Sequence, residues 1–169
     1  MSRYLARLQD PLTAEKIYSA CGRLALNWGQ LEITVDMLVI HLRARQRHPS
    51  TGFKYFDFPV SFTKKRDEIK DRLKKDPPLA PVRPAVTAFL SEAKKLHDIR
   101  VTVLHGICEG MRVDGRIAFM ISDMKGFGGW RHKYLTLTRI EEAADQMLSL
   151  YDVGGPLLRL MPLSDPPTE

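Results

Sequence analysis

Arg100 and His105 stand five positions apart and are the residues of this sequence best suited to chemistry on a charged substrate. The guanidinium of arginine offers planar, paired donors to phosphate. Histidine has an intrinsic pKa of about 6.5, so it can exchange a proton near neutral pH. Together the two side chains suffice for phosphodiester cleavage without a metal. The histidine acts as general base or acid on a ribose 2′-hydroxyl or leaving oxygen, and the arginine stabilises the charge on the phosphorane.

Arg100 also occupies a position that its helix reserves for apolar side chains. A helix is predicted over about residues 82–105, and its core-facing series is Val82, Val86, Phe89, Ala93, Leu96, Arg100 and Val103. A buried charge without a partner is strongly destabilising, so Arg100 needs an anion. Glu32, in the first predicted helix, would make Arg100 a structural brace, whereas a bound phosphate would make it a functional residue. Both alternatives stay open.

Two polar residues of the same helix, His97 and Asp98, are supporting candidates. They could orient His105 or bind substrate, or they could lie on the exposed helix surface. The five histidines and two cysteines lack the spacing of zinc sites, and the glycines lack phosphate-loop spacing. The sequence therefore implies no metal and no cofactor.

Positive charge is concentrated in one segment of the chain. Residues 43–75 contain eleven Lys or Arg residues and four acidic residues, a net charge of +7, although the whole chain carries +6. Such a segment is compatible with the RNA backbone. The candidate RNA-binding residues are Arg43, Arg45, Arg47, Lys64, Lys65 and Arg66. The alternative is a solvated helix face on which neighbouring carboxylates pair with these cations.

The longest predicted element is a helix over about residues 13–45. Its apolar residues alternate in spacing between three and four, which predicts one side buried along the whole helix. A second apolar stripe lies on another side and consists of Leu26, Ile33, Met37 and Ile40. A helix that is apolar on two sides must be covered twice, so the pattern indicates a homodimer.

The remaining pattern predicts a mainly α-helical bundle with a small antiparallel hairpin or sheet before the last helix. A charged helix is expected over 61–75, and strands over 107–113, 116–122 and 133–138, the first two joined by a tight turn at Asp114-Gly115. Thr138 and Glu141 have capping-box spacing and are expected to open the last helix. Gly154-Gly155-Pro156 is expected to kink or break it, with a shorter helical piece over 157–161.

Length and composition predict one domain over residues 1–169, with a core over about 13–161 and a frayed tail over 162–169. No apolar run approaches the roughly 20 residues of a membrane span. Two cysteines are too few for a disulfide framework. A cytoplasmic protein without a membrane partner is therefore expected. The loop over 46–60 holds Phe53, Tyr55, Phe56 and Phe58, which either cover the core or stack on RNA.

Around Arg100-x4-His105, followed by Gly106, the sequence resembles the HEPN superfamily, whose signature is Arg, four to six residues, then His. The surrounding layout is similar as well. Trp28, Leu31 and Glu32 lie in the first helix, a helix starts at Ser61, and a hairpin and a helix follow His105-Gly106. The likeness covers about residues 13–161.

The resemblance implies a helical bundle that dimerises so that the two motif helices meet, with Arg100 and His105 of both subunits in one cleft. Many members are metal-independent ribonucleases of toxin–antitoxin, phage-defence or RNA-processing systems, so RNA and an antitoxin protein are implied partners. Other members are inactive binding or assembly modules. Two positions depart from the pattern. Val101 follows the arginine where active members commonly carry Asn or Asp, and Ile107 stands where toxins paired with nucleotidyltransferase antitoxins carry Tyr.

Overall fold

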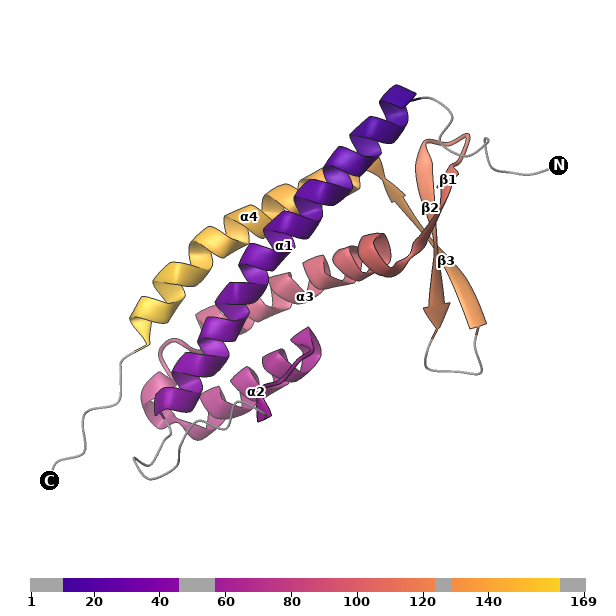
Figure 1. Ribbon diagram of the computed structural model, residues 1–169. Helices are drawn as coiled ribbons and strands as arrows, with labels where there is room; N and C mark the ends of the chain where they lie inside the picture. Colours follow the sequence, from indigo (N-terminus) through magenta and orange to yellow (C-terminus); the bar gives the residue numbers. More distant parts are fainter. Residues whose placement is uncertain (1–10, 46–56, 124–128, 162–169) are drawn as a thin grey trace, which may run out of the picture. The chain divides into compact units, whose positions relative to one another are not determined.

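The computed structural model describes residues 11–45, 57–123 and 129–161 (Figure 1). This part of the chain is mainly α-helical, with a three-stranded antiparallel sheet inserted before the last helix, which confirms the predicted fold class. Arg47, Phe53, Tyr55, Phe56 and the predicted tail lie outside the described residues. In chain order the elements are α1 (Pro11–Arg45), α2 (Phe62–Lys75), the 3-10 helix η2 (Pro77–Leu79), α3 (Arg83–His105), β1 (Ile107–Met111), β2 (Arg116–Asp123), β3 (Gly129–Thr136) and α4 (Leu137–Leu160).

The chain forms two compact units, and α1, α3 and α4 each contribute residues to both. Unit 1 comprises Met1–Gly29 and Lys94–Leu148, so it contains the sheet and the end of α3. Unit 2 comprises Gln30–Ala93 and Ser149–Glu169 and contains α2. None of the described helices combines the length and the apolar character that a membrane crossing requires.

α1 buries one side along its whole length, as its three–four spacing predicts. The buried residues of this side are at most 3% exposed and include Ile17, Leu24, Trp28, Leu31, Val35, Leu38 and Leu42. The second apolar stripe is exposed in the described part of the chain, with 73% exposure for Leu26, 61% for Ile33, 45% for Met37 and 39% for Ile40. These four apolar side chains are not covered by the described part of the chain itself. They are the surface on which the predicted homodimer depends.

α2 begins and ends where its local chemistry dictates. The Ser61 hydroxyl accepts a hydrogen bond from the Lys64 amide at 3.3 Å, which caps the helix and places its first residue at Phe62. Asp76 leaves the helical region because it precedes Pro77. The buried side of the helix consists of Phe62, Lys65, Ile69 and Leu73. A lysine therefore lies among the buried apolar residues of α2.

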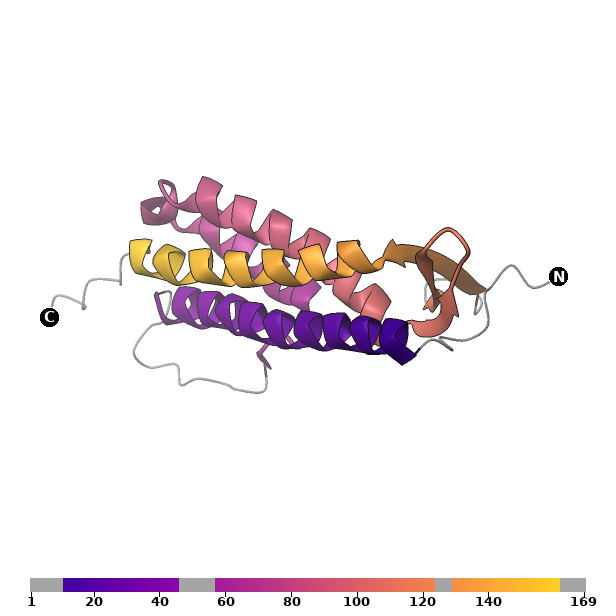
Figure 2. The ribbon, with the colours of Figure 1, turned by 90° about the horizontal axis from the view of Figure 1, so that it is seen from above.

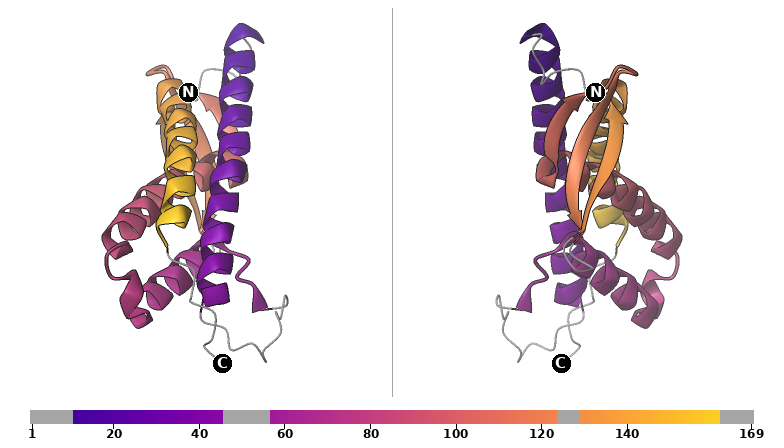
Figure 3. Two further views of the ribbon diagram at one scale, coloured as in Figure 1. Left: turned by 90° about the vertical axis from the view of Figure 1, so that its left-hand side faces the viewer. Right: turned by 90° about the vertical axis from the view of Figure 1, so that its right-hand side faces the viewer.

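The sheet has the order β1-β2-β3, and both pairs are antiparallel (Figure 3, right). The predicted tight turn is present: the Gly115 amide donates to the Arg112 carbonyl at 2.9 Å, and Gly115 has a φ of +76°, which favours glycine. The prediction for the third strand was wrong in its bounds. β3 spans Gly129–Thr136, since it pairs with β2 from Asp123↔Gly129 to Arg116↔Thr136, and this pairing rather than local alternation decides where the strand lies.

α4 starts two residues earlier than expected and is not broken. The Thr136 hydroxyl accepts from the Arg139 amide at 3.1 Å, so Thr136 takes the capping role expected of Thr138. The helix runs without interruption to Leu160 (Figure 2). Of the predicted kink or break at Gly154-Gly155-Pro156, the break and the separate helical piece over 157–161 were therefore wrong. Gly154 is buried against Thr34 of α1, and this packing in unit 2 overrides the low helix propensity of the three residues.

Gly154→Ala is expected to lower the free energy of unfolding by about 1–3 kcal/mol, because the added Cβ would lie 2.2 Å from Thr34 Cγ2 and overpack a closed contact. Gly155→Ala is the matched control. No atom lies within 4 Å of the Cβ position at Gly155, so the change should raise stability by about 0.5–1 kcal/mol through helix propensity. Urea unfolding of the two variants measures both signs, and equal effects would contradict the close packing at Gly154.

Candidate functional site

The last two turns of α3 bring Arg100 and His105 into contact. Arg100 Nη1 lies 2.7 Å from His105 Nε2, a hydrogen-bond distance. His105 is exposed at the end of the helix, and Arg100 is half-buried. The two candidate catalytic side chains are therefore in contact within unit 1, at a surface that a substrate can reach.

The contact fits one of the two tautomers of the imidazole. Arginine is always protonated in proteins and can only donate, so His105 Nε2 must accept with its lone pair. The proton of the neutral ring then lies on Nδ1. His105 thus presents a basic nitrogen that is held by a cation rather than by a carboxylate.

Arg100 itself lacks a carboxylate partner among the described residues of unit 1. Its guanidinium carbon lies 6.0 Å from the centroid of the Trp28 ring, and its Nε is buried and makes no hydrogen bond in the described part of the chain. The alternative partner, Glu32, belongs to unit 2, where Lys65 Nζ donates to it at 3.0 Å. The Arg100 guanidinium contacts the Trp28 ring and the His105 imidazole, neither of which carries a negative charge that would neutralise it. It can therefore bind an external anion.

Gly106, directly after His105, is required by close packing and not by a left-handed backbone conformation. Only Gly110 and Gly115 have a positive φ among the described glycines. A Cβ at Gly106 would lie 2.4 Å from the Thr102 carbonyl oxygen and 3.1 Å from Phe119 Cβ. The close approach of α3 to β2 at this point therefore requires glycine directly after His105.

The two supporting candidates point elsewhere. The His97 ring lies 5.2 Å from the Trp28 ring, and burial lowers the pKa of its imidazole, although the charge of Asp98 acts in the opposite direction. Lys94 Nζ lies 2.6 Å from Asp98 Oδ2, and the Asp98 carbonyl accepts from the Thr102 hydroxyl at 2.8 Å. The structure therefore places His97 and Asp98 on the same helix as the pair, with His97 against Trp28 and Asp98 against Lys94.

Most of the candidate RNA-binding cations of unit 2 form ion pairs. Arg43 Nε lies 2.6 Å from Glu68 Oε1, and Arg45 Nε lies 3.1 Å from Asp76 Oδ2. The hydrogen bond from Arg43 lowers the pKa of Glu68 and raises that of Arg43 itself. Lys65 is buried and paired with Glu32 and Asp36, and Arg66 pairs with Asp67. Such ion pairs agree with the alternative expectation, in which these cations pair with neighbouring carboxylates. Lys64 is exposed.

The sheet adds polar groups near the pair that local sequence patterns did not single out. Lys133 Nζ donates to the Thr102 hydroxyl at 3.3 Å, which places a cation of β3 beside the last turns of α3. On another side of the sheet His132 Nε2 lies 2.8 Å from Glu109 Oε2. These residues are 31 and 23 positions apart, so only the strand pairing brings them together.

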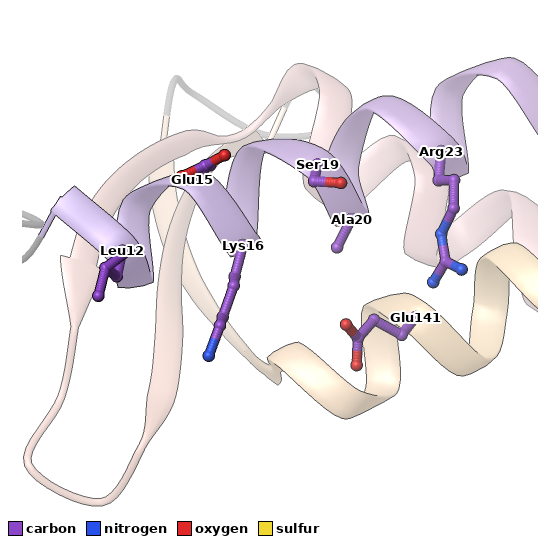
Figure 4. Close-up of a pocket in the computed structure, with 7 residues that line it drawn as sticks. All are labelled: Leu12, Glu15, Lys16, Ser19, Ala20, Arg23 and Glu141. Atoms are coloured by element: carbon purple, nitrogen blue, oxygen red, sulfur yellow. The ribbon is translucent and has the colours of Figure 1, made fainter.

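A surface cavity of about 450 Å³ lies between the first turns of α1 and α4 in unit 1 (Figure 4). Its charged lining is balanced, since Lys16 and Arg23 point toward the side of α4 that carries Glu141, and Glu15 adds a second carboxylate. No residue predicted to act in catalysis or RNA binding lines it. The described residues contain no group of three or more His, Cys, Asp or Glu side chains that could hold a metal ion.

Fold and site together define the class: a mainly helical protein with an inserted antiparallel sheet and a surface arginine–histidine pair at the end of a helix. Comparison of the chain with known protein families, with curated proteins and with solved structures finds no match. Its function must therefore be argued from its own residues.

Proposed function

We propose that this chain is a metal-independent endoribonuclease of the HEPN type, a component of a toxin–antitoxin, defence or RNA-processing system, in which Arg100 and His105 cleave RNA at a dimer cleft. The observation that carries the proposal is the 2.7 Å contact between Arg100 Nη1 and His105 Nε2 on an accessible helix end. It places a cation that could bind phosphate next to an imidazole that could act as a base.

The chemistry follows from the geometry of the pair. A phosphate that takes the donors of Arg100 releases His105 Nε2 from its hydrogen bond. The imidazole then removes the proton of the ribose 2′-hydroxyl while the 2′-oxygen attacks phosphorus and the bond to the 5′-oxygen breaks. The leaving oxygen takes up a proton, and a 2′,3′-cyclic phosphate remains. Arg100 stabilises the negative charge that develops on the phosphorane oxygens.

A non-catalytic assembly module with the same architecture is the second candidate. The contact of Arg100 with the Trp28 ring and the apolar Val101 next to it favour this reading, because both suit a side chain that merely closes the end of α3. An antitoxin or another protein partner would then use the helical surface without RNA chemistry.

The experiment that tests the nuclease uses an oligonucleotide made of DNA with one internal ribonucleotide, incubated with the purified chain in EDTA. We expect a cut only on the 3′ side of the ribonucleotide, with a cyclic phosphate on the upstream product, because the 2′-hydroxyl is the nucleophile. The all-DNA strand is the control and should stay intact. Absence of cleavage at micromolar protein, or cleavage of the all-DNA strand, would overturn this mechanism.

The dimer is part of the same proposal, and the exposed stripe of α1 is the surface that a second copy would cover. We expect light scattering to give twice the chain mass of 19.3 kDa for the wild type, and Ile33→Glu to produce the monomer, because a carboxylate would be buried in an apolar interface. Val153→Glu, at an exposed apolar position of α4, is the control and should stay dimeric. A dimeric Ile33→Glu variant would exclude the α1 stripe as the interface.

A further inference from the structure

The sheet of unit 1 has one apolar face and one aromatic, polar face. Ile117, Phe119 and Ile121 of β2 are at most 8% exposed and form the apolar face. The other face contains alternate residues of β3, namely Trp130, His132 and Tyr134, because side chains two positions apart in a strand share a face. Trp130 is 58% exposed. A tryptophan this exposed gains little from folding, which points to a binding role.

Two of the rings of this face, those of His132 and Tyr134, are aligned. The rings of His132 and Tyr134 are nearly parallel, with an angle of 13° between their planes and 6.2 Å between their centroids. Two guanidinium groups lie against Tyr134, that of Arg112 at 4.9 Å and that of Arg116 at 5.4 Å from the ring centroid. These five residues, Trp130, His132, Tyr134, Arg112 and Arg116, form what is called the stacking face below.

The carboxylates near the stacking face are already engaged. Glu109 Oε2 lies 2.8 Å from His132 Nε2, and Asp114 Oδ2 lies 2.6 Å from Arg116 Nη2. Asp114 Oδ2 also pairs with Arg112 Nε at 3.7 Å. These contacts hold the imidazole and the two guanidinium groups in place, so the face is preorganised. The two guanidinium groups also partly neutralise the negative charge of Asp114, which would repel a polyanion.

Unpaired nucleic-acid bases fit this combination of groups. Bases stack on aromatic rings and on guanidinium planes, and arginine can bind the phosphates between them. Arg131 and Lys133 alternate with the stacking-face residues along β3 and so lie on the opposite face of the sheet. Arg112 and Arg116 are therefore the arginines of the stacking face. A double helix hides its bases, so it cannot stack on such a surface. The chemistry therefore favours a single strand.

The stacking face and the Arg100–His105 pair belong to the same unit. β1 begins at Ile107, two residues after His105, and Lys133 of β3 donates to Thr102 of α3. A strand bound on the stacking face is therefore held by the same unit that carries the catalytic pair, and the start of β1 lies only two residues of chain from His105.

We propose that the stacking face binds the unpaired bases of single-stranded RNA and delivers the strand to Arg100 and His105. The proposal rests on the nuclease function for its choice of RNA, and it names the substrate as unpaired RNA with little base preference. It also moves the principal RNA contacts from the cations of residues 43–66 to the sheet.

The test measures binding of the full chain to a fluorescein-labelled, single-stranded 2′-O-methyl RNA, which cannot be cut, by fluorescence anisotropy. We expect Trp130→Ala and Tyr134→Ala to weaken binding about 5- to 50-fold each, the range of single-base stacking losses. Trp130→Phe should retain most of the affinity, since it keeps a stacking ring. Tyr18→Ala removes another exposed aromatic side chain of unit 1, from α1, and should leave the affinity unchanged.

The outcomes separate this inference from the nuclease itself. Binding that depends on Trp130, without any cleavage of the ribonucleotide-containing strand, would support the stacking face and refute the nuclease. Cleavage of RNA with the same affinity and KM in Trp130→Ala and Tyr134→Ala would overturn the stacking face and leave the nuclease standing. Equal affinity for a duplex and a single strand would also overturn it, because it would indicate backbone binding alone.

Discussion

Replacing His105 with alanine is expected to lower the rate of RNA cleavage by about 10²–10⁴-fold, the range for loss of a general base. Arg100→Ala should lower it about 10²–10³-fold, because the phosphorane loses its charge-stabilising donors. Single-turnover cleavage of the strand with one ribonucleotide, in EDTA, measures both. The two side chains act as a unit, so the double variant should be little slower than either single one.

The same variants separate catalysis from a structural role. The hydrogen bond between Arg100 and His105 is exposed, so its removal should change the free energy of unfolding by only about 0.5–1.5 kcal/mol. Lost cleavage with nearly unchanged stability would indicate chemistry, whereas a loss of several kcal/mol would indicate a brace. Lys95→Ala removes an exposed cation from the same helix and should not alter the rate. Full cleavage by both single variants would refute the assignment of the pair.

The second large effect is expected at Lys65, whose side chain is 6% exposed and contacts two carboxylates. Lys65 Nζ lies 3.0 Å from Glu32 Oε1 and 2.6 Å from Asp36 Oδ1. Lys65→Met should lower the free energy of unfolding by about 2–4 kcal/mol, because it leaves two partly buried carboxylates without their cation. Urea unfolding near neutral pH measures this.

The pKa of Lys65 explains why the unfolding measurement is made near neutral pH. Burial alone lowers the pKa of Lys65, but the hydrogen bonds to Asp36 and Glu32 outweigh it and raise the pKa above the ordinary value of 10.5. A lysine whose pKa is raised by folding contributes its full stabilisation at every pH below its unfolded-state pKa. This contribution is lost only as the pH rises through the folded-state pKa. Near neutral pH the contribution of the ion pair is therefore complete.

Lys64→Met is the matched control, since Lys64 is the exposed neighbour on α2. It should change stability by no more than about 0.5 kcal/mol. Adding Glu32→Gln and Asp36→Asn to Lys65→Met should restore much of the loss by removing the stranded charges. A Lys65→Met variant as stable as the wild type would contradict the buried ion pair, and a loss of RNA affinity without a loss of stability would return Lys65 to the RNA-binding residues.

Local patterns in the sequence were sufficient for much of this molecule. The three–four spacing predicted which side of α1 is buried, Ser61 and Pro77 predicted the ends of α2, and Asp114-Gly115 predicted the turn between β1 and β2. Arg100 and His105, which the sequence singled out by residue type, lie on one helix and contact each other. Each of these features depends on interactions within a few residues of chain, which is why spacing and residue type encode them.

Contacts between distant segments decided the rest. Pairing with β2 placed β3 four residues earlier than its own alternation suggested, and the packing of Gly154 on Thr34 kept α4 whole across a sequence that favours a break. The stacking face joins Arg112 and Arg116, at the turn between β1 and β2, to Tyr134 of β3, and Lys65, 33 residues away, is a partner of Glu32. A local pattern predicts which side of a helix or strand is apolar or charged. Which other element packs against that side depends on the free energy of the whole folded chain.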